Sequence, residues 1–74
     1  KKMKNKEKFL ITLLTKNLNS KKIIMTSDLN SFVKWDSLQK IRIILEMERK
    51  YKKKFPQNKL EFVNKPIDII KNLN

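Results

Sequence analysis

The sequence predicts an all-α protein: a small four-helix bundle of three longer helices and one short helix, with a long loop between the first and second helices. Apolar residues recur at helical spacing in separate segments, and turn-forming residues or proline lie between them. The apolar run at residues 23–26 has no evident partner strand, so we reject a strand there. A chain of 74 residues has room for one core, which predicts a single domain over residues 1–74.

The first helix is expected to begin at Met3 or Asn5 and to end at Leu18. Asn17 and Asn19 signal its end, because asparagine tolerates the left-handed conformation for which helices otherwise use glycine. The apolar stripe of this helix consists of Leu10, Leu13, Leu14 and Leu18, with Phe9 at its edge.

Residues 19–36 form the long connection to the second helix. Thr26, Ser27 and Asp28 favour a turn or a short helical start within it. The connection also carries apolar side chains that are expected to pin it over a helical core, namely Ile23, Ile24, Met25, Leu29, Phe32 and Val33.

The second helix is expected from Ser37 to about Lys53, with Asp36 as its N-cap. Phe55-Pro56 marks the break after it, since the residue before a proline avoids helical geometry. The apolar residues at helical spacing in this segment are Leu38, Ile41, Ile44, Leu45 and Tyr51.

A short turn of helix is expected at residues 58–63, and a last helix from Lys65 to Leu73. Asn64 is the expected cap of the last helix. Pro66 fits its first turn, where the missing N–H would have no intrahelical partner in any case.

The Ser37 hydroxyl should lie exposed in the first turn of the second helix. An anion attached there would meet unpaired backbone N–H groups and the positive end of the helix dipole. Ser37 is not expected to act as a catalytic nucleophile, because no neighbouring side chain could deprotonate it. The chain has no cysteine and no histidine, which excludes the usual nucleophile–base pairs and most zinc sites. We therefore expect neither an enzyme nor a metal site.

The tripeptide Asp36-Ser37-Leu38 resembles the signature of the acyl and peptidyl carrier protein family, in which the serine carries 4′-phosphopantetheine. The resemblance covers almost the whole chain, since residues 63–70 are similar to the closing segment of the family and Leu29 matches a buried apolar position. The second helix continues the family's apolar pattern and its ending with Ile41, Ile43, Ile44, Met47, Glu48 and Tyr51.

This resemblance implies a carrier that holds an acyl or aminoacyl group as a thioester on a 4′-phosphopantetheine arm at Ser37, as in fatty acid biosynthesis. It implies that Asp36 and Leu38 contribute to recognition by the modifying transferase and by partner enzymes. The implied partners are a phosphopantetheinyl transferase, an acyl- or aminoacyl-loading ligase, and a downstream acyltransferase or synthase. With Trp35 before the aspartate, the motif Trp-Asp-Ser-Leu is similar to that of carriers of specialised biosynthetic pathways. The other interpretation is that Trp35 covers the apolar underside of the loop.

In the second half of the chain, two features leave open what surface a partner enzyme would present and whether the aliphatic residues form a core or a channel. Carriers usually show acidic side chains along the second helix, whereas Arg42 and the run at residues 49–54 make this helix basic. That charge predicts a partner surface that is acidic, or one that is mainly apolar around Leu38. The following residues form either an ordinary core or a channel that shelters an acyl chain: Ile41, Ile44, Leu45, Leu60, Phe62, Val63, Ile67 and Ile70.

The formal net charge of +12 raises the alternative of a basic helical module that binds nucleic acid through lysine-rich helices. Arginine, which specific readers of bases favour, occurs only at Arg42 and Arg49. Abundant lysine, asparagine and isoleucine without glycine or alanine match an AT-rich coding sequence, so we expect the lysines to form mainly solvated faces. No apolar run approaches the roughly 20 residues that span a bilayer. We expect a monomer in the cytoplasm.

Overall fold

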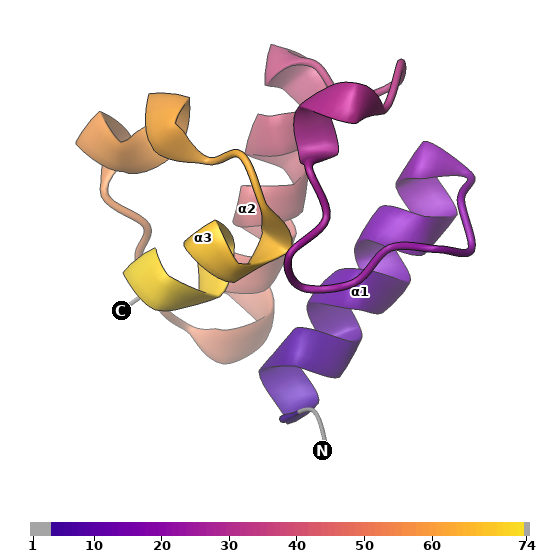
Figure 1. Cartoon of the computed structure of the whole chain (residues 1–74). Coiled ribbons are helices and arrows are strands. Elements are labelled where there is room, and N and C mark those ends of the chain that lie inside the picture. Colours follow the sequence, from indigo (N-terminus) through magenta and orange to yellow (C-terminus); the bar gives the residue numbers. More distant parts are fainter. Residues whose placement is uncertain (1–3, 74) are drawn as a thin grey trace.

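The computed structural model describes residues 4–73, and within that range the chain forms helices and loops without a strand. In chain order the elements are α1 (Asn5–Leu18), η1 (Leu29–Ser31), α2 (Ser37–Tyr51), η2 (Gln57–Phe62) and α3 (Pro66–Asn72), where η denotes a 3-10 helix (Figure 1). The all-α class and the long connection between α1 and α2 are confirmed. The alternative start of the first helix at Met3 lies outside the described residues.

The two ends of α1 follow from local hydrogen bonds. The Lys4 backbone N–H donates to the Glu7 carboxylate at 3.0 Å, one turn into the helix. Asn19 adopts the left-handed conformation with a φ of 54°, and its N–H donates to the Thr15 carbonyl. Asparagine thus takes the place of a glycine cap, as predicted. The helix buries Leu10, Leu14 and Leu18 and half-buries Leu13.

The connection from α1 to α2 is fastened to the chain that leads into α3. The Leu29 N–H donates to the Asn64 carbonyl at 2.8 Å, and the Ile67 N–H donates to the Met25 carbonyl at 2.9 Å. In Figure 1 the connection accordingly passes between α1 and α3. Leu29 is fully buried and Ile23 is 5% exposed, so these two side chains hold the connection over the core. The same role expected for Ile24 and Val33 is wrong, since they are 62% and 101% exposed.

α2 ends at Tyr51, two residues before the predicted Lys53, because Lys52 adopts the left-handed conformation with a φ of 53°. The Glu48 carboxylate then accepts a hydrogen bond from the Phe55 N–H at 2.6 Å. This bond ties the chain that leaves the helix back to its last turn.

The side of α2 that faces the core differs from the prediction. Ile43, Ile44 and Met47 are buried, whereas Ile41 and Leu45 are 45% and 51% exposed. An ordinary core role for Ile41 and Leu45 is therefore wrong. Helical spacing relates both sets equally well, and only packing against the other elements decides between them.

The start of α3 also differs in its cap. The N-cap position is Lys65 rather than Asn64, and the carboxylate that serves the helix start comes from inside the helix. Asp68 accepts from the backbone N–H groups of Asn64 and Lys65, each at 3.0 Å. Phe62, expected to lie in the core or a channel, is 64% exposed at the end of η2.

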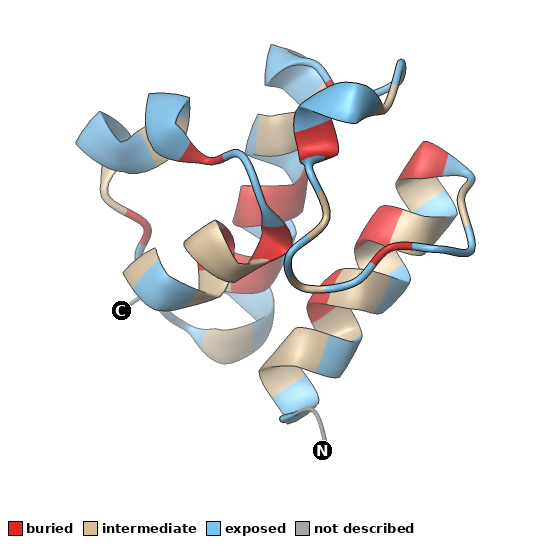
Figure 2. Cartoon of the chain, viewed as in Figure 1, coloured by how far each residue is buried: buried red, intermediate tan, exposed pale blue. Residues whose placement is uncertain are grey.

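One cluster of buried residues unites α1, α2, α3 and the connections (Figure 2). Its members with no exposed surface are Leu10, Leu14, Leu29, Met47 and Ile69. Figure 2 shows the buried positions on the inward sides of the three α-helices and the exposed positions on the outside. The first residues of α2 lie at an edge of this core, which leaves the predicted site at the surface.

Candidate functional site

The predicted site residues Asp36, Ser37 and Leu38 lie together at the start of α2, and all three are exposed. The Asp36 carboxylate accepts from the Gln39 N–H at 2.9 Å, and the Asp36 carbonyl accepts from the Lys40 N–H, also at 2.9 Å. The N–H groups of Ser37 and Leu38 precede these two bonds and have no partner within the helix. Ser37, the first residue of α2, therefore lies at the positive end of the helix dipole, where two backbone donors lack a helical partner.

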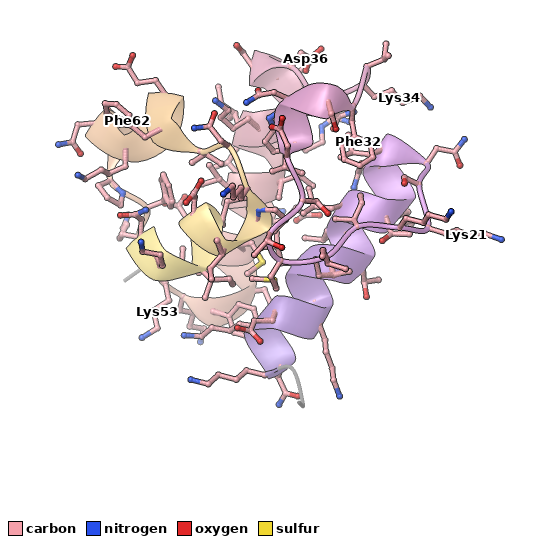
Figure 3. The ribbon with its side chains drawn as sticks, viewed as in Figure 1. Lys21, Phe32, Lys34, Asp36, Lys53 and Phe62 are labelled. Atoms are coloured by element: carbon pink, nitrogen blue, oxygen red, sulfur yellow. The ribbon has the colours of Figure 1, made fainter. Side chains whose placement is uncertain are left out.

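The chain that approaches this site is anchored by Trp35. Its side chain is only 8% exposed, and its backbone N–H donates to the Phe32 carbonyl at 3.0 Å. This burial supports the interpretation in which Trp35 covers the apolar underside of the loop. Figure 3 shows Phe32 and Lys34 close to Asp36, where the connection turns into α2. The Asp36 cap thus follows directly on a residue fixed in the core.

A small hollow of about 250 Å³ opens beside Ser37, between α2 and η2. The hollow is lined by Ser37, Lys40, Ile41, Leu60 and Glu61. The Lys40 ammonium donates to the Leu60 carbonyl at 3.0 Å and links the two elements across the hollow. This role of Lys40 could not be predicted from the sequence, because its partner is a backbone carbonyl distant along the chain.

A second hollow of about 460 Å³ shares Ile41 and Leu60 with the first. It extends along α2 to the chain after the helix, with Ile44, Leu45, Glu48, Lys54, Phe55 and Gln57 as its other lining residues. These two neighbouring hollows together are called the α2–η2 trough below, and Ser37 lines the first of them. The α2 residues that line the two hollows extend from Ser37 to Glu48, which is about 16 Å of helix at about 1.5 Å per residue.

The α2–η2 trough contains only part of the predicted channel. Ile41, Ile44, Leu45 and Leu60 line it, whereas Val63 is buried in the core. Phe55 was not predicted as a lining residue. Pro56 indicates extended backbone at Phe55, but only the fold brings Phe55 beside α2. Leu38 does not belong to the core, since it is 65% exposed.

Comparison with known proteins does not assign this site. No protein-family model matches the chain, and no curated protein or solved structure matches it. Among residues 4–73, no three acidic side chains gather in a way that could hold a metal ion. Over the same residues, every helix is too short or too polar to cross a bilayer.

Proposed function

We propose that this protein is a carrier that holds an acyl or aminoacyl group as a thioester on a 4′-phosphopantetheine arm attached to Ser37. One observation supports the proposal most strongly: an exposed serine at a capped helix start lines a small hollow between α2 and η2. A carrier needs these two features together. The serine gives a covalent attachment point, and the hollow beside it gives a mainly apolar surface for the cargo.

The residues at the helix start fit the arm. When bound, the arm supplies the terminal thiol that the chain itself lacks. A phosphopantetheinyl transferase would bring coenzyme A; the Ser37 oxygen would form the new ester bond to phosphorus, losing its proton as 3′,5′-ADP leaves. The backbone N–H groups of Ser37 and Leu38 are placed to donate to the resulting phosphodiester, whose charge suits the helix N-terminus.

Asp36 and Leu38 have separate roles in the proposal. Asp36 holds the first turn of α2 through its bond to the Gln39 N–H, and its exposed carboxylate is available to the transferase. Leu38 presents an exposed aliphatic side chain directly after the modified serine. It would contact the transferase, and later the loading ligase and the acyltransferase or synthase that takes the cargo.

The benefit to those enzymes is physical rather than catalytic. A tethered substrate reaches a docked enzyme at high effective concentration. The apolar walls of the trough, including Ile41 and Leu60, can cover part of an apolar cargo between visits and so reduce its contact with water. In this role the protein performs no chemistry itself, and we place it in the cytoplasm as a monomer.

The test is intact-protein mass spectrometry after incubation with coenzyme A, Mg²⁺ and a broad-specificity phosphopantetheinyl transferase. The parent chain should gain one phosphopantetheinyl group, and Ser37→Ala should gain none. Ser31→Ala is the matched control, because Ser31 is another exposed serine shortly before α2; it should be modified like the parent. Absence of a mass gain in a chain shown by circular dichroism to be folded would contradict the proposal.

A nucleic-acid-binding module is the second candidate, and one observation favours it. The chain after α2 gathers exposed cations at Lys52, Lys53 and Lys54 next to Arg49. Phosphate contacts by such a cluster would make affinity fall steeply with salt. Titration with duplex and single-stranded DNA across a salt series separates the candidates. Micromolar or tighter binding in moderate salt that falls steeply as salt rises would favour the nucleic-acid module, whereas a carrier should bind DNA only weakly even in moderate salt.

A further inference from the structure

The side of α2 that faces away from the core carries a second apolar stripe. Leu38, Ile41 and Leu45 follow one another at helical spacing and are 65%, 45% and 51% exposed. Single exposed aliphatic side chains are normal on a protein surface, but three on one helix face form a continuous patch. Since Ile43, Ile44 and Met47 already supply the core contacts of α2, the fold does not require this stripe.

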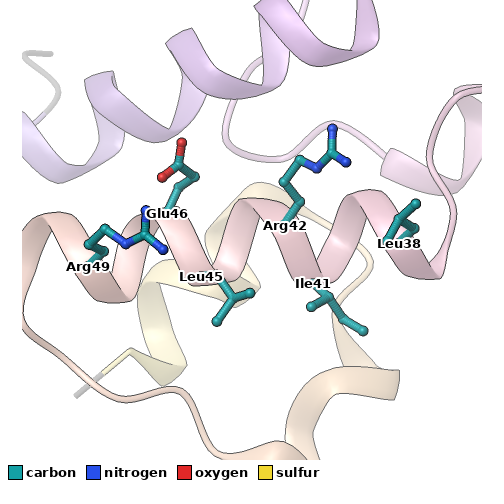
Figure 4. Close-up of a pocket in the computed structure, with 6 residues that line it drawn as sticks. All are labelled: Leu38, Ile41, Arg42, Leu45, Glu46 and Arg49. Carbon is teal, nitrogen blue, oxygen red and sulfur yellow. The ribbon is translucent and has the colours of Figure 1, made fainter.

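Charged side chains border the stripe. We call this surface the α2 face. Its six residues line an open, shallow hollow of about 300 Å³, and they are Leu38, Ile41, Arg42, Leu45, Glu46 and Arg49. Figure 4 shows Ile41 and Leu45 on one side of the helix and Arg42 and Glu46 on the other, with Arg49 farther along the same helix. The surface is therefore apolar along one side and carries two arginines and one glutamate along the other.

Helix stability alone does not explain why arginines lie along this side of α2. Arg49 lies in the last turn of α2, where a cation is favoured by the helix dipole. Arg42 lies near the middle of the helix, where that effect has faded. Glu46 offsets one of the two arginine charges, but the neighbouring hollow adds Lys52, Lys53 and Lys54. The excess positive charge at this end favours a partner of opposite sign.

We propose that the α2 face docks a protein partner whose contact surface sets acidic side chains around aliphatic anchors. The anchors would pack on Leu38, Ile41 and Leu45, which supplies affinity through burial. Carboxylates of the partner would meet Arg42 and Arg49, whose guanidinium groups bind them in bidentate fashion and fix the register. The proposal rests on the α2 face alone and holds whether or not Ser37 carries an arm.

The test uses the full chain and three synthetic helical peptides of equal length. One has a leucine stripe flanked by glutamates, the second has the same stripe flanked by lysines, and the third keeps the glutamates but replaces the leucines with serines. Fluorescence anisotropy gives the affinities, and amide chemical shifts locate the contact. The glutamate-flanked leucine peptide should bind about tenfold more tightly than either other peptide, with shifts centred on residues 38–49.

Charge and shape are then separated by variants. The double variant R42E/R49E should bind the glutamate-flanked peptide about tenfold more weakly, and Leu45→Ser should also weaken it. The control K21E/K22E makes the same change in net charge at two exposed residues of the connection; Figure 3 shows Lys21 on the far side of α1 from α2. The control should keep the affinity of the parent.

Several results would overturn the proposal. These are equal binding of the glutamate- and lysine-flanked peptides, no binding of either, or an equal loss in K21E/K22E and R42E/R49E. A dimer in sedimentation equilibrium that Leu45→Ser dissociates would assign the α2 face to a second copy of the chain instead. Tighter binding of duplex DNA or anionic vesicles that R42E/R49E abolishes would assign it to those polyanions.

Discussion

The two sides of α2 carry similar aliphatic side chains but meet different surroundings. Ile43, Ile44 and Met47 are almost completely buried against the other elements, whereas Leu38 and Leu45 keep more than half of their surface in water. Apolar character therefore does not decide burial on this helix; the placement of α1, α3 and the connections does. The buried side of α2 thus sets stability, while the exposed side and the helix start remain available for function.

The largest loss of stability is expected from a substitution on the buried side of α2. Met47→Ala should lower the free energy of unfolding by about 3 kcal/mol, because it leaves a cavity where Met47 has no exposed surface. Leu45→Ala, on the exposed side, should lower it by less than about 1 kcal/mol. Urea denaturation followed by circular dichroism measures both. Equal losses in the two variants would contradict the division of α2 into a core side and an exposed side.

The next effect concerns the start of the helix, where structure and recognition overlap. Asp36→Ala should cost about 1 kcal/mol of stability, since the Gln39 N–H loses its acceptor. Asp36→Asn should keep the cap, because asparagine is an equally good N-cap residue. If the transferase reads the carboxylate, Asp36→Asn should still be modified more slowly than the parent chain. A thermal melt and a time course of Ser37 modification separate the two roles; parent-like modification would leave Asp36 with a capping role alone.

A smaller effect is expected where the exposed side meets η2. Lys40→Met removes the hydrogen bond to the Leu60 carbonyl but keeps most of the aliphatic stem. We expect a loss of about 0.5–1 kcal/mol and faster amide hydrogen exchange in η2 than in α1. Unchanged exchange throughout η2 would show that the Lys40 bond does not hold the α2–η2 trough together.

The smallest effect should be a gain at the other end of α2. Lys52 has a positive φ of 53°, a conformation that glycine adopts without steric cost. Lys52→Gly should therefore raise the stability by about 0.5 kcal/mol or leave it unchanged, the gain being limited by the greater freedom of glycine in the unfolded chain. A clear loss in a thermal melt would mean that the lysine side chain contributes contacts of its own.

Sequence alone predicted those parts of the fold that short-range chemistry determines. The end of α1 follows from Asn19, and the start of α2 follows from the Asp36 cap. Sequence did not decide which aliphatic residues of α2 are buried, because both sets satisfy the same helical period. The sequence also did not identify Asp68 as the acceptor at the start of α3, because Asn64 and Asp68 are both residue types that accept hydrogen bonds from free N–H groups at a helix start.

The candidate site was predictable to a similar extent. Its three residues and their exposure follow from the helix start, which is local. The α2–η2 trough was not predictable in full, because it depends on how Phe55 and Leu60 fold back along α2. The bonds that fasten this half of the chain, such as Lys40 to the Leu60 carbonyl, join residues distant in sequence. Patterns of spacing carry no information about such pairs.

The most direct measurement is peptide-level mapping of the modification on the full chain after reaction with coenzyme A, Mg²⁺ and the transferase. Fragmentation should place one phosphopantetheinyl group on Ser37. The terminal thiol of the attached arm should then accept an acyl group from a loading enzyme. A modification mapped to another serine, or a folded chain that stays unmodified, would contradict the central claim that Ser37 is the attachment point of a carrier.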